Sequence, residues 1–157
     1  MRGISGLAPA TPIAIDDVGT LEPWIEPMAA EAAAEGFGFV DRLVREWQSG
    51  ENTFCAAGER FVLARVDDRT VGICGLNRDA SAPDGATGRL RHLYVRPAWR
   101  RRGVGKALVE EVLGSAPSSF SRVRLRTDDA AAGAFYRALG FAGSTEPNAT
   151  HVYVFRC

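Results

Sequence analysis

Residues 88–113 read GRLRHLYVRPAWRRRGVGKALVEEVL, and this stretch predicts a strand, a tight turn and a helix. Aromatic and branched residues lead up to Val95, and Pro97 should end the strand because proline cannot donate a ladder hydrogen bond. From Val104 onward, apolar residues recur at helical spacing, with charged residues on the opposite face. The turn between strand and helix carries three consecutive arginines followed by Gly-Val-Gly.

This turn has the chemistry of an anion-binding site. The first backbone N–H groups of a helix have no partner inside the helix, and the helix dipole adds positive potential there. Gly103 and Gly105 carry no side chain that would keep a ligand away from the backbone. Cationic side chains cluster around the turn: Arg96, Arg100, Arg101, Arg102 and Lys106. We therefore expect a ligand with several phosphates.

Two common phosphate-binding motifs do not fit the turn. A P-loop requires Ser or Thr after Gly-Lys, whereas Gly105-Lys106 is followed by Ala107. The dinucleotide fingerprint requires a third glycine where this sequence has Leu108.

The turn instead matches the pattern Arg/Gln-x-x-Gly-x-Gly/Ala, at Arg100, Gly103 and Gly105, after a strand that ends Leu-Tyr-Val. It resembles the acetyl-coenzyme A loop of the GNAT N-acetyltransferase superfamily. A second block, at residues 129–141, is similar to the family's helix with the pattern Asn-x-x-Ala-x-x-Phe/Leu-Tyr followed by Gly-Phe. The two blocks occur in the family's order and spacing, so the resemblance covers the second half of the chain.

The resemblance implies an α/β fold with a mixed (α+β) sheet, as one domain over residues 1–157. This is a three-layer arrangement: a mostly antiparallel central sheet with one splayed parallel strand pair, and helices on both faces. The strands ending near Val95 and Thr127 would separate, the backbone of Leu93 and Val95 would pair with the pantetheine arm, and the amides of residues 101–105 would hold the pyrophosphate. The residues that the resemblance assigns to acetyl-coenzyme A, as co-substrate, are Leu93, Tyr94, Val95, Arg100, Arg101, Arg102, Gly103, Val104, Gly105, Lys106 and Asp129.

The remaining elements follow from periodicity and from breaking residues. Near the N-terminus we expect a short strand or a frayed tail at residues 4–8, and then a helix from Asp16 or Asp17 that Pro23 and Pro27 kink or split. The later elements are helices over 29–35 and 39–48, a hairpin of 61–66 with 70–76, a strand over 123–127, a helix over 130–139 and a last hairpin within 141–155.

Tyr136 is the catalytic candidate. When an amine attacks a thioester, a thiolate leaves, and a phenol within reach can protonate or hydrogen-bond it. The family often has a tyrosine at this motif position. The alternative is a core aromatic residue beside Phe135. Asp129 stands where the family has Asn; it can cap the following helix, but it cannot donate a hydrogen bond as an amide would.

The base that accepts the amine proton is left open by the sequence. Strict alternation along the central strand places Arg89 and Arg91 on the face of Leu93 and Val95, and arginine is not a base. Alternation places His92 on the opposite face as a structural histidine. His151, which begins the last strand, is either the base or structural, and a water chain is a third route.

Acceptor residues are proposed from two features. The segment 36–39 between the first two helices often lines the acceptor site in this family, so Phe37 either contacts substrate or packs in the core. Arg91, with Arg89, either recognises an anionic group of the substrate or pairs with Asp79 or Asp84.

The composition of the chain limits the classes of partner and the location that we expect. Nineteen basic and nineteen acidic residues cancel, which argues against nucleic acid or a membrane surface as a partner. No apolar run suggests a membrane span or a signal peptide, so the default location is the cytoplasm. Three widely spaced cysteines fit reduced thiols, and no metal-ligand spacing occurs. The sequence leaves a homodimer open.

Three functions of different classes remain. The first, which the motifs favour, is an acetyl-coenzyme A-dependent N-acetyltransferase that moves the acetyl group to the primary amine of a small molecule or amino-acid-like acceptor by direct attack. The second is a non-catalytic acyl-coenzyme A binding or sensing module; the missing carboxylate base favours it and Tyr136 opposes it. The third is a nucleic-acid binder that uses residues 96–106, which the zero net charge opposes.

Overall fold

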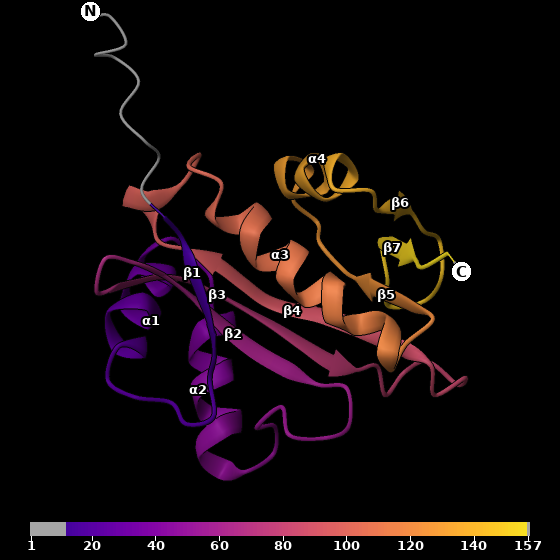
Figure 1. Ribbon diagram of the computed structural model, residues 1–157, viewed down its shortest axis with the longest axis horizontal. Coiled ribbons are helices and arrows are strands. Elements are labelled where there is room, and N and C mark those ends of the chain that lie inside the picture. Colours follow the sequence, from indigo (N-terminus) through magenta and orange to yellow (C-terminus); the bar gives the residue numbers. More distant parts are fainter. Residues whose placement is uncertain (1–11, 157) are drawn as a thin grey trace, which may run out of the picture.

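The computed structural model describes residues 12–156, and a single mixed sheet runs through this part of the chain (Figure 1). Its strand order is β1-β2-β3-β4-β5-β7-β6, and every neighbouring pair is antiparallel except β4 and β5. The strands are β1 (Ala14–Asp17), β2 (Arg60–Val66), β3 (Arg69–Arg78), β4 (Thr87–Val95), β5 (Arg122–Leu125), β6 (Ala142–Gly143) and β7 (His151–Val154).

Helices cover both faces of the sheet (Figure 1). On one face lie α1 (Ile25–Ala34) and α2 (Phe39–Ser49), and on the other lie α3 (Val104–Ser115) and α4 (Ala130–Ala138). The predicted three-layer α/β fold with a mixed sheet is therefore confirmed. None of the helices in the described part of the chain is long and apolar enough to cross a bilayer.

Each face of the sheet has its own apolar core. On the α3 face, the buried stripe of α3, including Leu108 and Val112, packs against β2 and β3. On the opposite face, Met28 of α1 and Leu43 of α2 pack with Ile73 of β3. The helical stripe predicted from Val104 onward is thus the one that holds α3 against the sheet.

Two N-terminal expectations fail. The helix expected from Asp16 or Asp17 is wrong, because these residues end strand β1, which pairs with β2. Their carboxylates bind Arg65 and Arg60 across the strand pair, and this tertiary pairing overrides the local helix-start signal. Pro27 does not kink or split α1, because it lies in the first turn, where the missing N–H has no helical acceptor. The strand expected at residues 4–8 lies outside the described residues.

The later elements match their predicted ranges closely. The hairpin of β2 and β3, the strand β5, the helix α4 and the final β6–β7 pair are all present, with end differences of a few residues. Residues 116–118 form a single 3-10 turn after α3.

The pairing of β4 opens the space for the site. β4 pairs with β5 only at Thr87, Gly88 and Arg89, so residues 90–95 have no strand beside them on that edge. On its other edge β4 pairs with β3, and the register shifts where Cys74 lies opposite residues 92 and 93. At this point β4 has one residue more than β3, which is a β-bulge, and His92 in the bulge has a φ of 60°.

Candidate functional site

A cleft of about 1170 Å³ occupies the gap between β4 and β5. We call this cavity the cleft. It runs from the glycine turn before α3, along the unpaired edge of β4 and past α4, to the segment between α1 and α2. The predicted splaying of the two parallel strands is therefore present, and the open backbone edge of residues 90–95 faces a cavity long enough for an extended ligand.

One end of the cleft is the glycine turn. Gly103 is the N-cap of α3 with a φ of 82°, a conformation that favours glycine, and no heavy atom lies within 4 Å of a Cβ built there. A Cβ at Gly105 would lie 3.3 Å from the Phe135 ring, so glycine lets α3 approach α4 closely. The first backbone N–H groups of α3 therefore stand beside open space, as anion binding requires.

The predicted co-substrate residues are mostly brought together here. Arg102 is the exception: its guanidinium packs over the Trp99 ring at 5.3 Å, and it does not belong to the described lining of the cleft. The other ten line it: Leu93, Tyr94, Val95, Arg100, Arg101, Gly103, Val104, Gly105, Lys106 and Asp129.

Arg100 and Asp129 of this set already have protein partners, as does the hydroxyl of Tyr94, which donates to Glu35. Arg100 binds the carboxylate of Glu35 with both of its terminal nitrogens. Among the cationic residues of the turn that line the cleft, Arg101 and Lys106 therefore remain available to a ligand. Asp129 is the N-cap of α4, where its Oδ1 accepts a hydrogen bond from the Ala131 amide at 2.9 Å. The predicted capping role of Asp129 is confirmed.

Tyr136 lies on α4 and lines the cleft. Its ring packs against Phe135 and Phe141, and the residue is only 8% exposed, yet it lines the cavity. Burial raises the pKa of the Tyr136 hydroxyl above its ordinary value, with a further contribution from Cys74. The phenol therefore keeps its proton at neutral pH and is available as a donor.

The β-bulge changes which side chains of β4 share a face. The prediction that Arg89 and Arg91 lie on the face of Leu93 and Val95 is wrong, because the extra residue at the bulge shifts the alternation. Leu93 and Val95 pack with the α3 core, whereas Arg91 reaches Glu46 of α2. Arg91 and His92 are consecutive, yet both lie toward α2.

His92 is buried beside the cleft without a hydrogen-bond partner. Its ring stacks on Phe39 and meets Phe54 edge-on, with 8% of the residue exposed. Within residues 12–156 neither ring nitrogen has a hydrogen-bond partner. Burial lowers the pKa of His92 to about 4, helped by the positive charge of Arg91. The ring is therefore neutral at pH 7, and an unpaired buried polar group of this kind points to a ligand.

His151 has a different environment. It begins β7 and is buried behind α4, where Thr150 Oγ1 lies 2.9 Å from its Nδ1 and Arg137 Nη1 lies 3.3 Å from its Nε2. It does not belong to the described lining of the cleft, although the centroid of its ring lies 6.4 Å from that of the Tyr136 ring, so it packs behind Tyr136 rather than facing the cavity. The sequence signal that favoured His151, its position after a loop, gave no information on this packing.

Phe37 and the two arginines of β4 lie at the far end of the cleft. Phe37 is 40% exposed at its mouth, which argues against the core alternative. Arg89 donates to Asn148 O at 2.8 Å and reaches Asp79 at 3.3 Å, so the expected pairing with Asp79 is confirmed for this residue. Arg91 has no such strong partner: Asn77 Oδ1 is 3.4 Å away and Glu46 Oε1 is 3.7 Å away.

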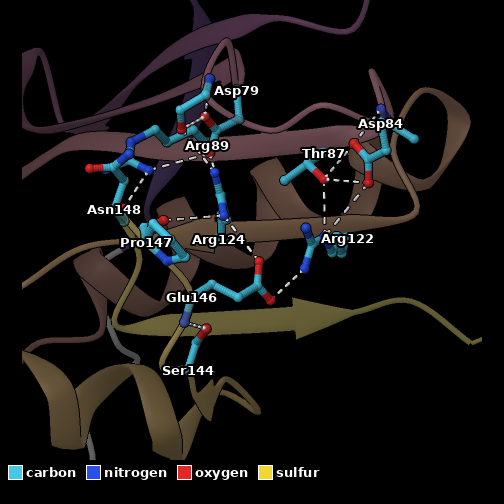
Figure 2. Close-up of polar contacts among 12 residues, drawn as sticks. Asp79, Asp84, Thr87, Arg89, Arg122, Arg124, Ser144, Glu146, Pro147 and Asn148 are labelled. Carbon is cyan, nitrogen blue, oxygen red and sulfur yellow. Dashed lines mark hydrogen bonds and ion pairs between the residues drawn. The ribbon is translucent and has the colours of Figure 1, made fainter.

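An ion network fixes the β6–β7 loop against the sheet next to this end (Figure 2). Arg124 of β5 joins Asp79, at 2.6 Å, to Glu146 of the loop, at 3.1 Å. Arg122 adds a second contact with Glu146 at 2.7 Å, and Arg89 holds the carbonyl of Asn148. The network had no counterpart in the sequence analysis beyond the Arg89–Asp79 pair, because its members lie far apart along the chain.

A family model described as an acetyltransferase (GNAT) domain matches residues 57–142. The chain belongs to the GNAT acetyltransferase family. The match includes the glycine turn and Tyr136, so the two motifs that carried the resemblance lie inside it. No cluster of three or more His, Cys, Asp or Glu side chains suited to a metal ion occurs in the described part of this GNAT chain.

Solved GNAT structures share the fold. A putative acetyltransferase from Exiguobacterium sp. 255-15 superposes with a TM-score of 0.82 at 28% identity, covering 91% of this chain and 93% of that one. The PaiA N-acetyltransferase of Thermoplasma acidophilum, solved in complex with coenzyme A, gives a TM-score of 0.59 at 17% identity and covers 92% and 99% of the two chains. The second likeness is one of fold alone.

The curated relatives extend well beyond the segments that match this chain. The N-alpha-acetyltransferase RimI of Mycobacterium tuberculosis is 35% identical over 81 residues, which cover 52% of this chain and 51% of RimI. A further mycobacterial relative is 31% identical over 145 residues, which are 37% of its length. The chain thus spans between about a third and a half of the curated relatives that it matches.

Proposed function

We propose that this GNAT protein is an acetyl-coenzyme A-dependent N-acetyltransferase that acts on the primary amine of a small molecule or amino-acid-like acceptor. One observation carries the proposal: the glycine turn, the unpaired edge of β4 and Tyr136 line one continuous cleft. The turn offers amides and the side chains of Arg101 and Lys106 to phosphates. The edge of β4 offers backbone groups of Leu93 and Val95 to the amides of pantetheine.

The reaction is a direct transfer within this cleft. The amine nitrogen forms a bond to the thioester carbonyl carbon, the carbon–sulfur bond breaks, and the sulfur leaves with the electron pair. The nitrogen gives up one proton to water in the open cleft, and the sulfur takes one. Tyr136 stabilises the departing sulfur by donating a hydrogen bond or its proton, a contribution worth roughly 100 to 10,000-fold in rate.

The position of Tyr136 supports this role. It lies on α4 and lines the same cleft as the glycine turn and the residues of β4, and its raised pKa keeps the donor proton in place. The curated relative RimI is named an N-alpha-acetyltransferase, which supports N-acetylation as the class of reaction. The acceptor end is supplied by β4 together with Phe37, Phe39 and Arg42.

The test separates cofactor binding from catalysis. Calorimetric titration with acetyl-coenzyme A compares the wild type with Gly103→Glu, which places a carboxylate where phosphate is expected and strains a residue with positive φ. Gly114→Glu is the matched control, because Gly114 lies at the other end of α3, exposed and with no heavy atom within 4 Å of a built Cβ. We expect binding by the wild type and Gly114→Glu and none by Gly103→Glu.

A thiol-release measurement over a panel of primary amines then tests turnover. Turnover of at least one amine, reduced by Tyr136→Phe, supports the proposal. Binding of acetyl-coenzyme A without turnover of any amine would support instead the acyl-coenzyme A binding or sensing module. Absence of binding by the wild type would contradict both functions.

A further inference from the structure

The charge of the cleft is unbalanced at its acceptor end. Seven cationic side chains and two carboxylates, both at the start of α4, line the described part of the cleft. Three of the cations belong to the glycine turn, where Glu35 pairs with Arg100 and the phosphates of acetyl-coenzyme A would balance Arg101 and Lys106. Three others, Arg42, Arg89 and Arg91, line the opposite end; carboxylates from outside the described lining pair with two of them, Glu46 at 2.9 Å from Arg42 and Asp79 at 3.3 Å from Arg89. An acceptor with an anionic group would complement this end.

Arg91 is the member of this group that lacks compensation. Its side chain is 24% exposed, and its two contacts, with Asn77 and Glu46, are long for hydrogen bonds. Glu46 also binds Arg42 at 2.9 Å, so its charge is shared. Burial lowers the pKa of Arg91, which reflects the cost of holding this cation away from water. A guanidinium has five donors, and a carboxylate can accept two of them side by side.

The bulge in β4 adds a second group next to Arg91. In a regular strand, residues 91 and 92 would lie on opposite faces, but here both side chains lie toward α2. His92 has two ring nitrogens without a partner among the described residues. Because the ring is neutral at pH 7, one of its nitrogens is a hydrogen-bond acceptor.

We propose that the acceptor is an amino acid with an apolar side chain: Arg91 binds its carboxylate, and His92 accepts a hydrogen bond from its amine. In an amino acid these two groups are attached to the same carbon, which fits two adjacent side chains on one face. Phe37, exposed at the mouth, and Phe39, stacked on His92, supply apolar contact for the side chain. This proposal rests on the proposed acetyltransferase function and specifies its substrate class.

The test compares acids with their carboxamides. L-phenylalanine, L-leucine and L-methionine are each measured against the corresponding amide, which keeps the amine and the side chain but has no carboxylate. At saturating acetyl-coenzyme A, we expect the wild type to favour the acids in kcat/KM by at least about tenfold. Arg91→Gln should lose roughly 10 to 100-fold for the acids and stay within about twofold for the amides.

Two further variants serve as controls for Arg91→Gln. Arg91→Lys keeps the charge without the planar fork, so it should fall between wild type and Arg91→Gln for the acids. Arg69→Gln removes an exposed arginine at the start of β3, outside the cleft, and should change neither series. Equal activity toward acids and amides in the wild type, or an equal loss of both in Arg91→Gln, would overturn the proposal.

Binding measurements keep the acceptor proposal separate from the catalytic one. L-phenylalanine and L-phenylalaninamide are titrated calorimetrically into protein saturated with coenzyme A. Binding of the acid that Arg91→Gln weakens by tenfold or more supports the acceptor class even when no amine is turned over, in which case only the catalytic function fails. Absence of acid binding to this complex, with coenzyme A bound, overturns the acceptor class alone.

Discussion

The guanidinium of Arg100 binds both carboxylate oxygens of Glu35, at 2.6 and 2.8 Å. Glu35 is the C-cap of α1, and its Oε2 also accepts a 2.6 Å hydrogen bond from the Tyr94 hydroxyl. The hydrogen bond from Arg100, and then that from Tyr94, lower the pKa of Glu35, so the pair is ionised at neutral pH. The first arginine of the phosphate loop is thereby tied to the helix that precedes the acceptor segment, and its charge is neutralised.

Replacing Glu35 by Gln should strengthen acetyl-coenzyme A binding. The amide oxygen can still accept one hydrogen bond from Arg100, but the NH2 group cannot accept the other, and the charge of Arg100 is left uncompensated near the phosphate end of the cleft. We expect a Kd about two- to fivefold lower at low ionic strength, with the gain lost in high salt because the side chain of Arg100 is 41% exposed. Calorimetric titration at two salt concentrations measures this.

Glu31→Gln is the matched control for Glu35→Gln. Glu31 also lies on α1 and binds Arg96 with both oxygens at 2.9 Å, but Arg96 does not belong to the described lining of the cleft. This variant should leave the Kd unchanged. Weaker binding by Glu35→Gln would show that the pair positions the loop more than it reduces its charge.

His92 should make the fold sensitive to mild acid. Its pKa of about 4 in the fold lies below the ordinary value near 6.5 of an unfolded histidine, so the unfolded chain binds the proton more readily. This contribution to stability is complete above pH 6.5 and is lost as the pH falls to about 4, amounting to about 3 kcal/mol. The charged groups that act on the ring are Arg91, Glu46 and Arg42, and both arginines stay charged across this range. Burial alone would raise the pKa of Glu46, but the hydrogen bond from Arg42, with the charges of both arginines, outweighs burial and lowers that pKa below its ordinary value.

His92→Phe tests that window. Phenylalanine suits the aromatic surroundings of Phe39 and Phe54, so the variant should fold. Urea unfolding between pH 7 and pH 4 should show the free energy of unfolding of the wild type falling by about 3 kcal/mol more than that of the variant. Parallel pH dependence of the two proteins would mean that His92 is already charged or hydrogen-bonded at neutral pH.

The sequence located the phosphate end of the cleft better than the acceptor end. Gly103, Gly105 and Tyr136 belong to local patterns, in which spacing along a turn or helix determines which groups meet. The bulge at His92 depends instead on an extra residue in β4 opposite Cys74 of β3, and strict alternation has no means of detecting it. One inserted residue moved Arg89 and Arg91 to the other face.

The first strand was missed for a related reason. Asp16 and Asp17 are good helix-start residues by local chemistry, but they pair with Arg65 and Arg60 of β2 across more than forty residues of chain. The ion network at the β6–β7 loop likewise depends on contacts between distant segments, so composition and periodicity contain no sign of it.

Asp79 should make a large contribution to stability at neutral pH. Burial alone would raise its pKa, but hydrogen bonds from Arg124 and Ser81 outweigh that effect and hold the pKa at about 2 (Figure 2). Because the unfolded value lies near 3.9, this stabilisation is present above pH 4 and is lost as the pH falls toward 2, a window below that of His92. It amounts to roughly 2.5 kcal/mol.

Asp79→Asn should cost about 3 to 5 kcal/mol at pH 7, because it leaves the buried guanidinium of Arg124 without its closest anion. Urea unfolding at pH 7 measures the loss. Asp84→Asn is the control, since Asp84 is exposed, its contact with Arg122 is 3.9 Å long, and an amide oxygen can still accept the hydrogen bonds that Ala86 and Thr87 donate to Oδ1, so this substitution should cost far less. Equal losses in the two variants would mean that the Asp79–Arg124 pair contributes no more than an exposed carboxylate.

Tyr136→Phe should lower kcat by roughly 100 to 10,000-fold and leave the Kd for acetyl-coenzyme A unchanged. The ring contacts with Phe135 and Phe141 need no hydroxyl, so the cleft keeps its shape while the sulfur loses its donor. Tyr153→Phe is the matched control: Tyr153 also packs on Phe141, at 5.4 Å, but does not belong to the described lining of the cleft, and its variant should keep wild-type kcat. Burial raises the pKa of the Tyr136 hydroxyl, so the hydroxyl should stay protonated up to about pH 10. We therefore expect no decrease in kcat from its ionisation below that pH. A fall in kcat of less than about threefold would contradict the catalytic role. It would mean that water protonates the departing thiolate and that Tyr136 only lines the cleft.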